Sequence, residues 1–238
     1  MTDSTDKSHG SHSLAGVVIL AGGASKRMGS PKAALMLPTN ETLLNYHVRQ
    51  ALMLNVPIMI ADNARGFTVD SELLANNPKL PIFHIADYDS TVYDTTITTN
   101  PNDTGGALVA IESALQTLVN LNDSTPIKNK SESWLLVISC DSLIPASELW
   151  QKLQPFSAQA TDKSVICLTD DAHLYPLLGL YQLSIEHELR AYIDCGERKV
   201  MRFIKPITQA VPVPQAWLPL TNLNTPEDFK RACTTLDK

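Results

Sequence analysis

Cysteine is scarce in this sequence, and no two cysteines stand close together. The 238 residues contain 4 of them, far apart along the chain: Cys140, Cys167, Cys195 and Cys233. A zinc knuckle or a disulfide framework needs paired cysteines at short or regular spacing, so neither is indicated. We therefore expect four reduced thiols in the core of the protein.

Long apolar runs are missing as well. No stretch approaches the roughly 18 consecutive apolar residues of a transmembrane helix. Residues 1–13 are polar and lack the apolar segment of a signal peptide. We expect a cytoplasmic protein with a short disordered leader at 1–13 and no association with a membrane.

Positive charge is in short supply. Lys and Arg number 19 against 25 Asp and Glu, which gives a formal net charge of −6. Binding to nucleic acid or to an anionic membrane needs a broad basic field, so the composition argues against both. Any recognition of an anion must be local. With 44% hydrophobic residues the chain can bury a substantial core, and a single domain over 14–238 is favoured over two small ones.

The sequence also offers no Ser-His-Asp or Cys-His arrangement for nucleophilic catalysis. It does contain a glycine-rich, cationic loop directly after the apolar run 16–20. Paired glycines let the backbone approach an anion and donate N–H groups to it, while nearby cations neutralise its charge. The cations of this loop are Lys26, Arg27 and Lys32. The loop predicts phosphate binding, with an ordinary β–α turn as the alternative.

The spacing in this loop excludes two common nucleotide motifs. A Walker A loop needs a glycine followed by Lys and then Ser or Thr, and no glycine here is followed in that way. The dinucleotide fingerprint needs glycines at its third and sixth positions, but Ala24 and Arg27 stand there after Gly22. A different kind of nucleotide loop is indicated.

Strand and helix patterns alternate along the chain. Wholly apolar strands between amphipathic helices predict a mainly parallel sheet covered on both faces, with ligands gathered at the carboxyl ends of the strands. Polar stretches at 88–103 and 120–133 predict surface loops. Further strands are expected at 56–61, 80–86, 134–139, 163–168 and 177–183, and helices at 41–54, from Gly106, from Ala146, at 184–195 and at 226–236.

Two carboxylates follow predicted strands. Asp141 comes directly after the apolar run 134–139, where a Mg²⁺ ion bound by one or two carboxylates and substrate phosphates would be placed. Asp87 follows the strand at 80–86 and could converge on the same edge. The alternative for each is a turn-forming or capping role.

Two polar groups stand out in the last third of the chain. Asn222 and Asn224 precede a helix whose first residues are Pro226, Glu227 and Asp228, with Thr225 as its cap. Asparagine oxygens can ligate Mg²⁺ or its waters, and the start of a helix favours phosphate. Arg198 and Lys199, with Arg202 close by, form either an anion-binding group or a solvated basic turn.

The order of these motifs resembles the family of molybdenum cofactor guanylyltransferases, within the Rossmann-like nucleoside-triphosphate transferases. The resemblance covers 14–232. Pro31 and Ala107 depart from it, at positions where the family commonly has Asp and Pro. The residues that carry it are Leu20-Ala21-Gly22-Gly23, Arg27-Met28-Gly29, Lys32, Gly106, Leu108, Cys140-Asp141, Gly196-Glu197-Arg198-Lys199-Val200-Met201 and Asn222-Leu223-Asn224-Thr225-Pro226-Glu227-Asp228.

The resemblance implies a Rossmann-like three-layer α/β/α fold, Mg²⁺ as cofactor, and transfer of GMP from GTP to the terminal phosphate of molybdopterin or Mo-molybdopterin. It implies that Arg27, Lys32 and Asp141 are catalytic and that Asp141 holds the metal. Either Asp62 or Asn63 would read the guanine base. The other binding residues implied are Leu20, Ala21, Gly22, Gly23, Lys32, Asp87 and Gly106 for the nucleotide, Arg198 and Lys199 for the pterin phosphate, and Asn222 and Asn224 along the site.

Other functions stay open at this point. A related enzyme could use CTP, or attach the nucleotide to a sugar phosphate. A protein of another class could carry the cofactor or a nucleotide without turning it over. Molybdoenzymes or cofactor-insertion proteins are the protein partners that the resemblance suggests.

Overall fold

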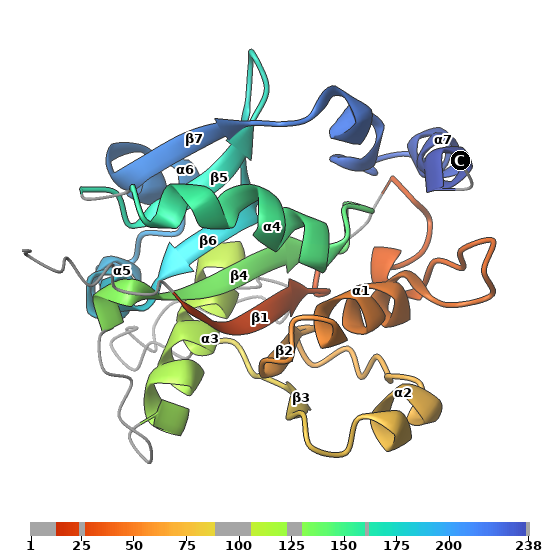
Figure 1. Cartoon of the computed structure of the whole chain (residues 1–238), viewed down its shortest axis with the longest axis horizontal. Coiled ribbons are helices and arrows are strands. Elements are labelled where there is room, and N and C mark those ends of the chain that lie inside the picture. The colour runs from red at the N-terminus through yellow and green to blue at the C-terminus, as the bar shows by residue number, and fades with distance from the viewer. Residues whose placement is uncertain (1–12, 24–26, 89–105, 123–129, 160–161, 237–238) are drawn as a thin grey trace, which may run out of the picture.

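The centre of the computed structural model is a seven-stranded sheet in the order β3-β2-β1-β4-β6-β5-β7 (Figure 1). The structure describes residues 13–23, 27–88, 106–122, 130–159 and 162–236. The strands are β1 (Ser13–Leu20), β2 (Ile58–Ala61), β3 (Ile82–His84), β4 (Ser133–Ser139), β5 (Val165–Thr169), β6 (Leu174–Gln182) and β7 (Thr208–Pro212).

Most neighbouring strands run parallel, as the apolar strand patterns predicted. β1 pairs in parallel with both β2 and β4, β2 with β3, and β5 with β7. β6 runs antiparallel to both of its neighbours, β4 and β5. The carboxyl ends of β1, β2 and β4 therefore meet at one edge of the sheet, where the amino end of β6 joins them.

Helices cover both faces of the sheet and make the three layers that were expected. Val17 and Ile19 of β1 pack on one face, in the same core cluster as residues of α1 and α4. Val18 and Leu20 pack on the other face with residues of α3 and α5. The helices are α1 (Leu43–Leu52), α2 (Ser71–Asn76), α3 (Ala107–Asn122), α4 (Ala146–Ser157), α5 (Glu186–Asp194), α6 (Val200–Ile204) and α7 (Pro226–Leu236).

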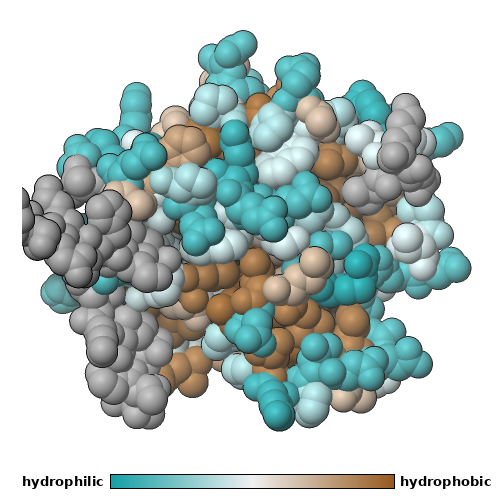
Figure 2. All heavy atoms as spheres, viewed as in Figure 1, coloured by the Kyte–Doolittle hydropathy of each residue, from teal (hydrophilic) through white to brown (hydrophobic). Residues whose placement is uncertain are grey.

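The face that carries α1 and α4 leaves hydrophobic side chains at the surface. Figure 2 shows them in the middle of this view, between polar groups, around the places where α4 and α1 lie in Figure 1. Leu52 and Leu54, at the end of α1, and Trp150 of α4 are partly buried against the core, and Met53 is 70% exposed. Among the described helices, none is long and apolar enough to cross a lipid bilayer.

Several expectations need correction or lie outside the described residues. Residues 120–122, assigned to a loop, belong to α3. Cys195 is exposed, whereas the other three thiols are buried as expected. β1 begins at Ser13, the last residue assigned to the leader, and 1–12 and 89–105 are not described. The division into a leader and one domain stays a prediction.

Candidate active site

Three cavities open at the carboxyl edge of the sheet, and Asp141 lines all three. The first has a volume of about 350 Å³ and lies where β1 and β4 end. It brings the cationic loop and the carboxylate after the central strand together, as the sequence predicted. Its polar and glycine lining comprises Gly23, Arg27, Lys32, Ser139, Asp141 and Asn224, and Leu20 and Ala21 line its apolar side.

The second cavity extends from the same glycines toward β2. It has a volume of about 200 Å³ and shares Leu20, Gly23 and Asp141 with the first. The residues that distinguish it from the first cavity come from the ends of β1 and β2, the segment after β3, the start of α3 and β6: Gly22, Ala61, Asn63, Asp87, Gly106, Ala107, Ala110 and Leu177.

The third cavity lies on the other side of Asp141, against β6, with a volume of about 300 Å³. Its walls include His173, Tyr175, Leu177, Thr221 and Asn222. Of these five, the sequence patterns pointed only to Asn222. The patterns placed ligands at the carboxyl ends of strands, whereas β6 runs antiparallel and contributes its amino end to this edge.

Main-chain hydrogen bonds fix the strand ends around the glycine loop. The Ala21 N–H donates to the Ala61 carbonyl at 2.8 Å, and the Cys140 N–H donates to the Leu20 carbonyl at 3.1 Å. A side chain at Gly22 would clash, since its Cβ would lie 2.9 Å from the Cβ of Asn63. A Cβ at Gly23 would meet no described atom within 4 Å. The close approach of Asn63 explains why a glycine stands at position 22. Gly23 lines the first two cavities, where a side chain would take up space.

In the segment after β2, Asp62 and Asn63 make different contacts. The Asp62 side chain is buried, and its Oδ2 accepts the N–H groups of Gly66 at 3.0 Å and Phe67 at 3.1 Å. The same oxygen lies 3.2 Å from Nδ1 of His84. Asp62 therefore anchors its own loop, while Asn63, with a φ of 54°, lines the second cavity. Asparagine tolerates this left-handed conformation better than most residues.

Asp87 lines the second cavity together with Asn63. Burial raises the pKa of the Asp87 carboxyl above its ordinary value, and the negative charge of Asp62 raises it further. A partly desolvated carboxylate in a cleft is a group that gains from a hydroxyl or N–H donor supplied by a ligand.

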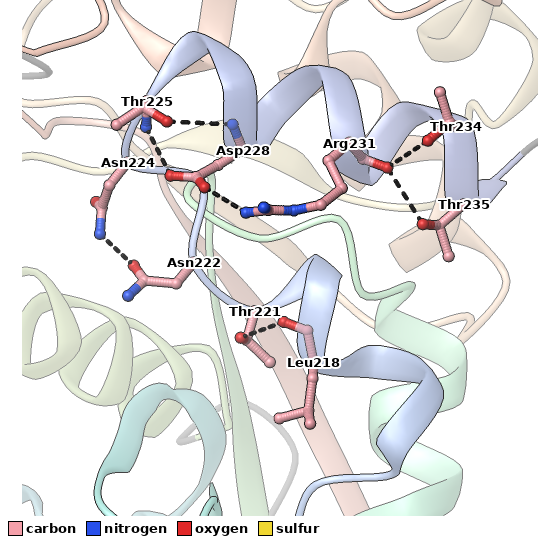
Figure 3. A network of polar contacts seen from close by, with 9 residues as sticks. All are labelled: Leu218, Thr221, Asn222, Asn224, Thr225, Asp228, Arg231, Thr234 and Thr235. Carbon is pink, nitrogen blue, oxygen red and sulfur yellow. Dashed lines mark hydrogen bonds and ion pairs between the residues drawn. The ribbon is translucent and has the colours of Figure 1, made fainter.

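A hydrogen-bond chain joins the first cavity to the third. Lys32 lies in a short 3₁₀ helix, η1 (Lys32–Ala34), and its Nζ donates to Oδ1 of Asn224 at 3.2 Å. The Asn224 amide in turn donates to Oδ1 of Asn222 at 2.8 Å (Figure 3). Burial lowers the pKa of Lys32, and so does Arg27, while the Asp141 carboxylate acts in the opposite direction. Two cations near one carboxylate are placed to take up negative charge from a ligand.

The segment that carries these asparagines is held at both ends. The Leu223 N–H donates to the Asp141 carbonyl at 2.7 Å. At the start of α7 the Thr225 hydroxyl accepts from the Asp228 N–H at 3.1 Å, and the Asp228 carboxylate accepts from the Thr225 N–H at 3.0 Å (Figure 3). This reciprocal capping confirms the predicted cap and fixes Asn222 and Asn224 beside Asp141.

The structure does not bring Arg198 and Lys199 into these three cavities. The Arg198 guanidinium donates to the carbonyls of Ile193 at 2.6 Å and Glu197 at 2.9 Å, and so stabilises the carboxyl end of α5. Lys199 caps the start of α6. Their proposed contact with the pterin phosphate stays a prediction.

The donor set around Asp141 suits one kind of metal ion. Within the described ranges, no group of three or more His, Cys, Asp or Glu side chains is placed to hold a metal. One carboxylate beside a glycine-rich, cationic loop fits Mg²⁺, which commonly takes one or two carboxylates and fills its other positions with phosphate oxygens and water.

The three layers, the mainly parallel sheet and the glycine-rich loop at its carboxyl edge define a Rossmann-like α/β protein. Residues 17–211 match the family described as MobA-like NTP transferase domain, and the chain belongs to that family.

Similar proteins cover nearly the whole chain. A molybdenum cofactor guanylyltransferase from Vibrio atlanticus is 24% identical over 89% of this chain and 92% of its own length. A molybdenum cofactor guanylyltransferase from Haemophilus influenzae is 25% identical over 90% of this chain and 95% of its own length. The crystal structure of molybdopterin-guanine dinucleotide biosynthesis protein A from Archaeoglobus fulgidus is 19% identical, with a TM-score of 0.63 over 93% of this chain and 98% of that one, and it shares the fold.

Proposed function

We propose that this chain transfers GMP from GTP to the terminal phosphate of molybdopterin or Mo-molybdopterin, with release of pyrophosphate. The observation that carries the proposal is the meeting of three cavities at Asp141, two on the side of the glycine loop and one on the side of β6. Curated guanylyltransferases that match about nine tenths of the chain support the choice of substrates.

The first two cavities suit GTP. Backbone N–H groups at Gly22 and Gly23, with Arg27 and Lys32, would bind the triphosphate. In the second cavity Asn63 offers both a donor and an acceptor to the edge of a base. Asp87, which lines the same cavity, would accept a hydrogen bond from a ribose hydroxyl or a base N–H.

The third cavity suits the acceptor. Tyr175 and Leu177 provide an aromatic and an apolar wall for a flat ring system, and Asn222 provides a polar group near Asp141. A phosphate at the Asp141 end of this cavity would face the α-phosphate of GTP in the first cavity. The Lys32–Asn224–Asn222 chain lies along the boundary between the two ligands.

The chemistry requires alignment more than proton transfer. An oxygen of the acceptor phosphate monoester attacks the α-phosphorus, and the bond from that phosphorus to the bridging oxygen of pyrophosphate breaks. Because the second pKa of a phosphate monoester is about 6, the nucleophile is largely ionised at neutral pH and needs no general base. The residues have to align two polyanions and neutralise their repulsion. Bound Mg²⁺ at Asp141 would add charge neutralisation at the phosphates.

A nucleotide comparison tests the proposal. The purified chain is supplied with molybdopterin, Mg²⁺ and one of GTP, CTP or ATP, and pyrophosphate and the dinucleotide product are measured. We expect product from GTP alone, and none after EDTA treatment. Asp141→Ala should abolish transfer. Asp162→Ala, which removes an exposed carboxylate before β5, should leave the rate unchanged.

Other outcomes contradict the proposal in distinct ways. Faster turnover with CTP would assign the chain to cytidylyl transfer. Tight GTP binding without pyrophosphate release from any nucleotide would make it a carrier.

A further inference from the structure

The turn that follows Asp141 is held by three successive main-chain carbonyls. The Asp141 carbonyl accepts from the Leu223 N–H at 2.7 Å. The next carbonyl, of Ser142, lies 2.9 Å from Nε2 of His47, and the Leu143 carbonyl accepts from the Tyr46 hydroxyl at 2.9 Å. Two of the three donors are side chains from the first turns of α1. The orientation of this turn therefore depends on α1.

His47 makes an unusual contact for a core residue. Its side chain is 0% exposed, and burial lowers its pKa to about 4, so the ring is neutral at physiological pH. Since a carbonyl can only accept, the proton of the neutral ring is on Nε2. Nδ1 then carries a lone pair and has no hydrogen-bond partner among the described residues.

An apolar side chain would serve a purely structural role at this position with less penalty. Burying an imidazole with one unsatisfied nitrogen costs free energy that a leucine or phenylalanine of similar volume would not cost. What the imidazole supplies, and those residues lack, is an N–H group aimed at the carbonyl next to Asp141. The single polar contact of His47 in the described structure is to this turn.

The same helix is linked to the cationic side of the first cavity. α1 begins shortly after η1, which carries Lys32, and the Leu43 N–H at the start of α1 donates to the Leu35 carbonyl at 2.8 Å. The helix therefore contacts the segment that presents Lys32 at one end, and through His47 the turn that presents Asp141. The separation of the cation and the carboxylate across the cavity depends on both attachments.

We infer that His47 is a positioning residue for Asp141: its Nε2–H holds the Ser142 carbonyl and so directs the Asp141 carboxylate into the cavities. This inference rests on the proposed function of the site, in which Asp141 binds a divalent cation beside the triphosphate. His47 itself lies behind the turn and touches neither substrate.

Four variants test this role. His47→Leu removes the donor, and His47→Gln keeps an amide N–H near the position of Nε2. Val48→Ala shortens a fully buried neighbour on the same helix whose side chain cannot donate a hydrogen bond to the turn. The fourth is Asp141→Ala. Thermal unfolding is followed for each, and assays are run well below every transition.

Mn²⁺ binding in the presence of GTP, followed by electron paramagnetic resonance, reports on the carboxylate without requiring turnover. For His47→Leu we expect Mn²⁺ affinity and kcat to fall about 10–100-fold, the usual effect of losing an outer partner of a metal ligand. The KM for GTP should change little. His47→Gln should restore most of both losses, and Val48→Ala should lower the transition temperature without either loss.

Two results would overturn the inference. One is unchanged Mn²⁺ affinity and kcat in His47→Leu, and the other is an equal loss in Val48→Ala at a similar transition temperature. If the wild-type chain forms no dinucleotide at all, the proposed function fails, while the Mn²⁺ measurement still decides the role of His47.

Discussion

Two neighbouring residues of one loop have different surroundings. Asp62 and Asn63 are both polar and adjacent, and the motif alone left open which of them meets the base. The structure separates them: the Asp62 carboxylate accepts two N–H groups of its own loop, and Asn63 lines the second cavity. Which of two adjacent side chains points into a cavity depends on the backbone path, and this path includes left-handed conformations at Asn63 and Ala64.

Replacing Asn63 should weaken nucleotide binding selectively. In Asn63→Ala we expect the KM for GTP to rise about 10-fold, as for the loss of one or two buried hydrogen bonds, with little change in kcat or in the transition temperature. Asp62→Ala should instead lower the transition temperature, because two N–H groups lose their acceptor. Steady-state kinetics and thermal unfolding of both variants check this. If Asp62→Ala changed nucleotide selectivity and kept full stability, the assignment would be reversed.

For the helices and strands, the sequence predicted where each element lies along the chain better than which way each strand runs in the sheet. The apolar strands and the final helix at 226–236 follow from local patterns, and the structure confirms them. β7, α2 and α6 are short and were missed. The contribution of β6 to the site was also missed, because strand direction is decided by pairing with β4 and β5, which a local pattern does not contain.

The contact between α3 and α5 contains a buried carboxyl group, that of Glu112. Glu112 of α3 is 0% exposed, and its Oε1 lies 3.2 Å from Nε of Arg190 on α5. Arg190 also pairs with Glu186, so one guanidinium serves two carboxylates. Burial raises the pKa of Glu112 to about 7, from an ordinary value of 4.5. Charging this residue at higher pH therefore opposes the packing of the two helices.

This arrangement predicts a pH-dependent effect on stability. Between pH 4.5 and about 7 the folded chain keeps the Glu112 proton while the unfolded chain releases it. The contribution of this group to stability therefore falls as pH rises through that window. Glu112→Gln should be more stable than the wild type at pH 8, by up to about 3 kcal/mol, and should lose this advantage toward pH 5.

Urea unfolding of both proteins across this pH range measures the difference directly. The contributions of the other titrating groups to the unfolding free energy are the same in both proteins and cancel in the difference. A difference in unfolding free energy that stays constant with pH would show that Glu112 is charged in the folded chain throughout.

In the whole molecule, positive charge gathers at one site although the net charge is negative. The chain carries a net charge of −6, yet Arg27 and Lys32 line one cavity at the carboxyl edge of the sheet. An acidic surface with a small cationic site disfavours extended polyanions and admits a small phosphate ligand. The length, the charge and the order of motifs predicted this location. They did not predict three cavities around Asp141, because Tyr175 and Asn222 come together only through the folding of distant segments.

A crystal structure with a non-hydrolysable GTP analogue and Mg²⁺ would show directly whether the nucleotide binds beside Asp141. We expect the triphosphate over Gly23 between Lys32 and Asp141, the guanine edge at Asn63, and the α-phosphorus facing the third cavity. A nucleotide bound away from Asp141, or with its base in the cavity beside Tyr175, would contradict it.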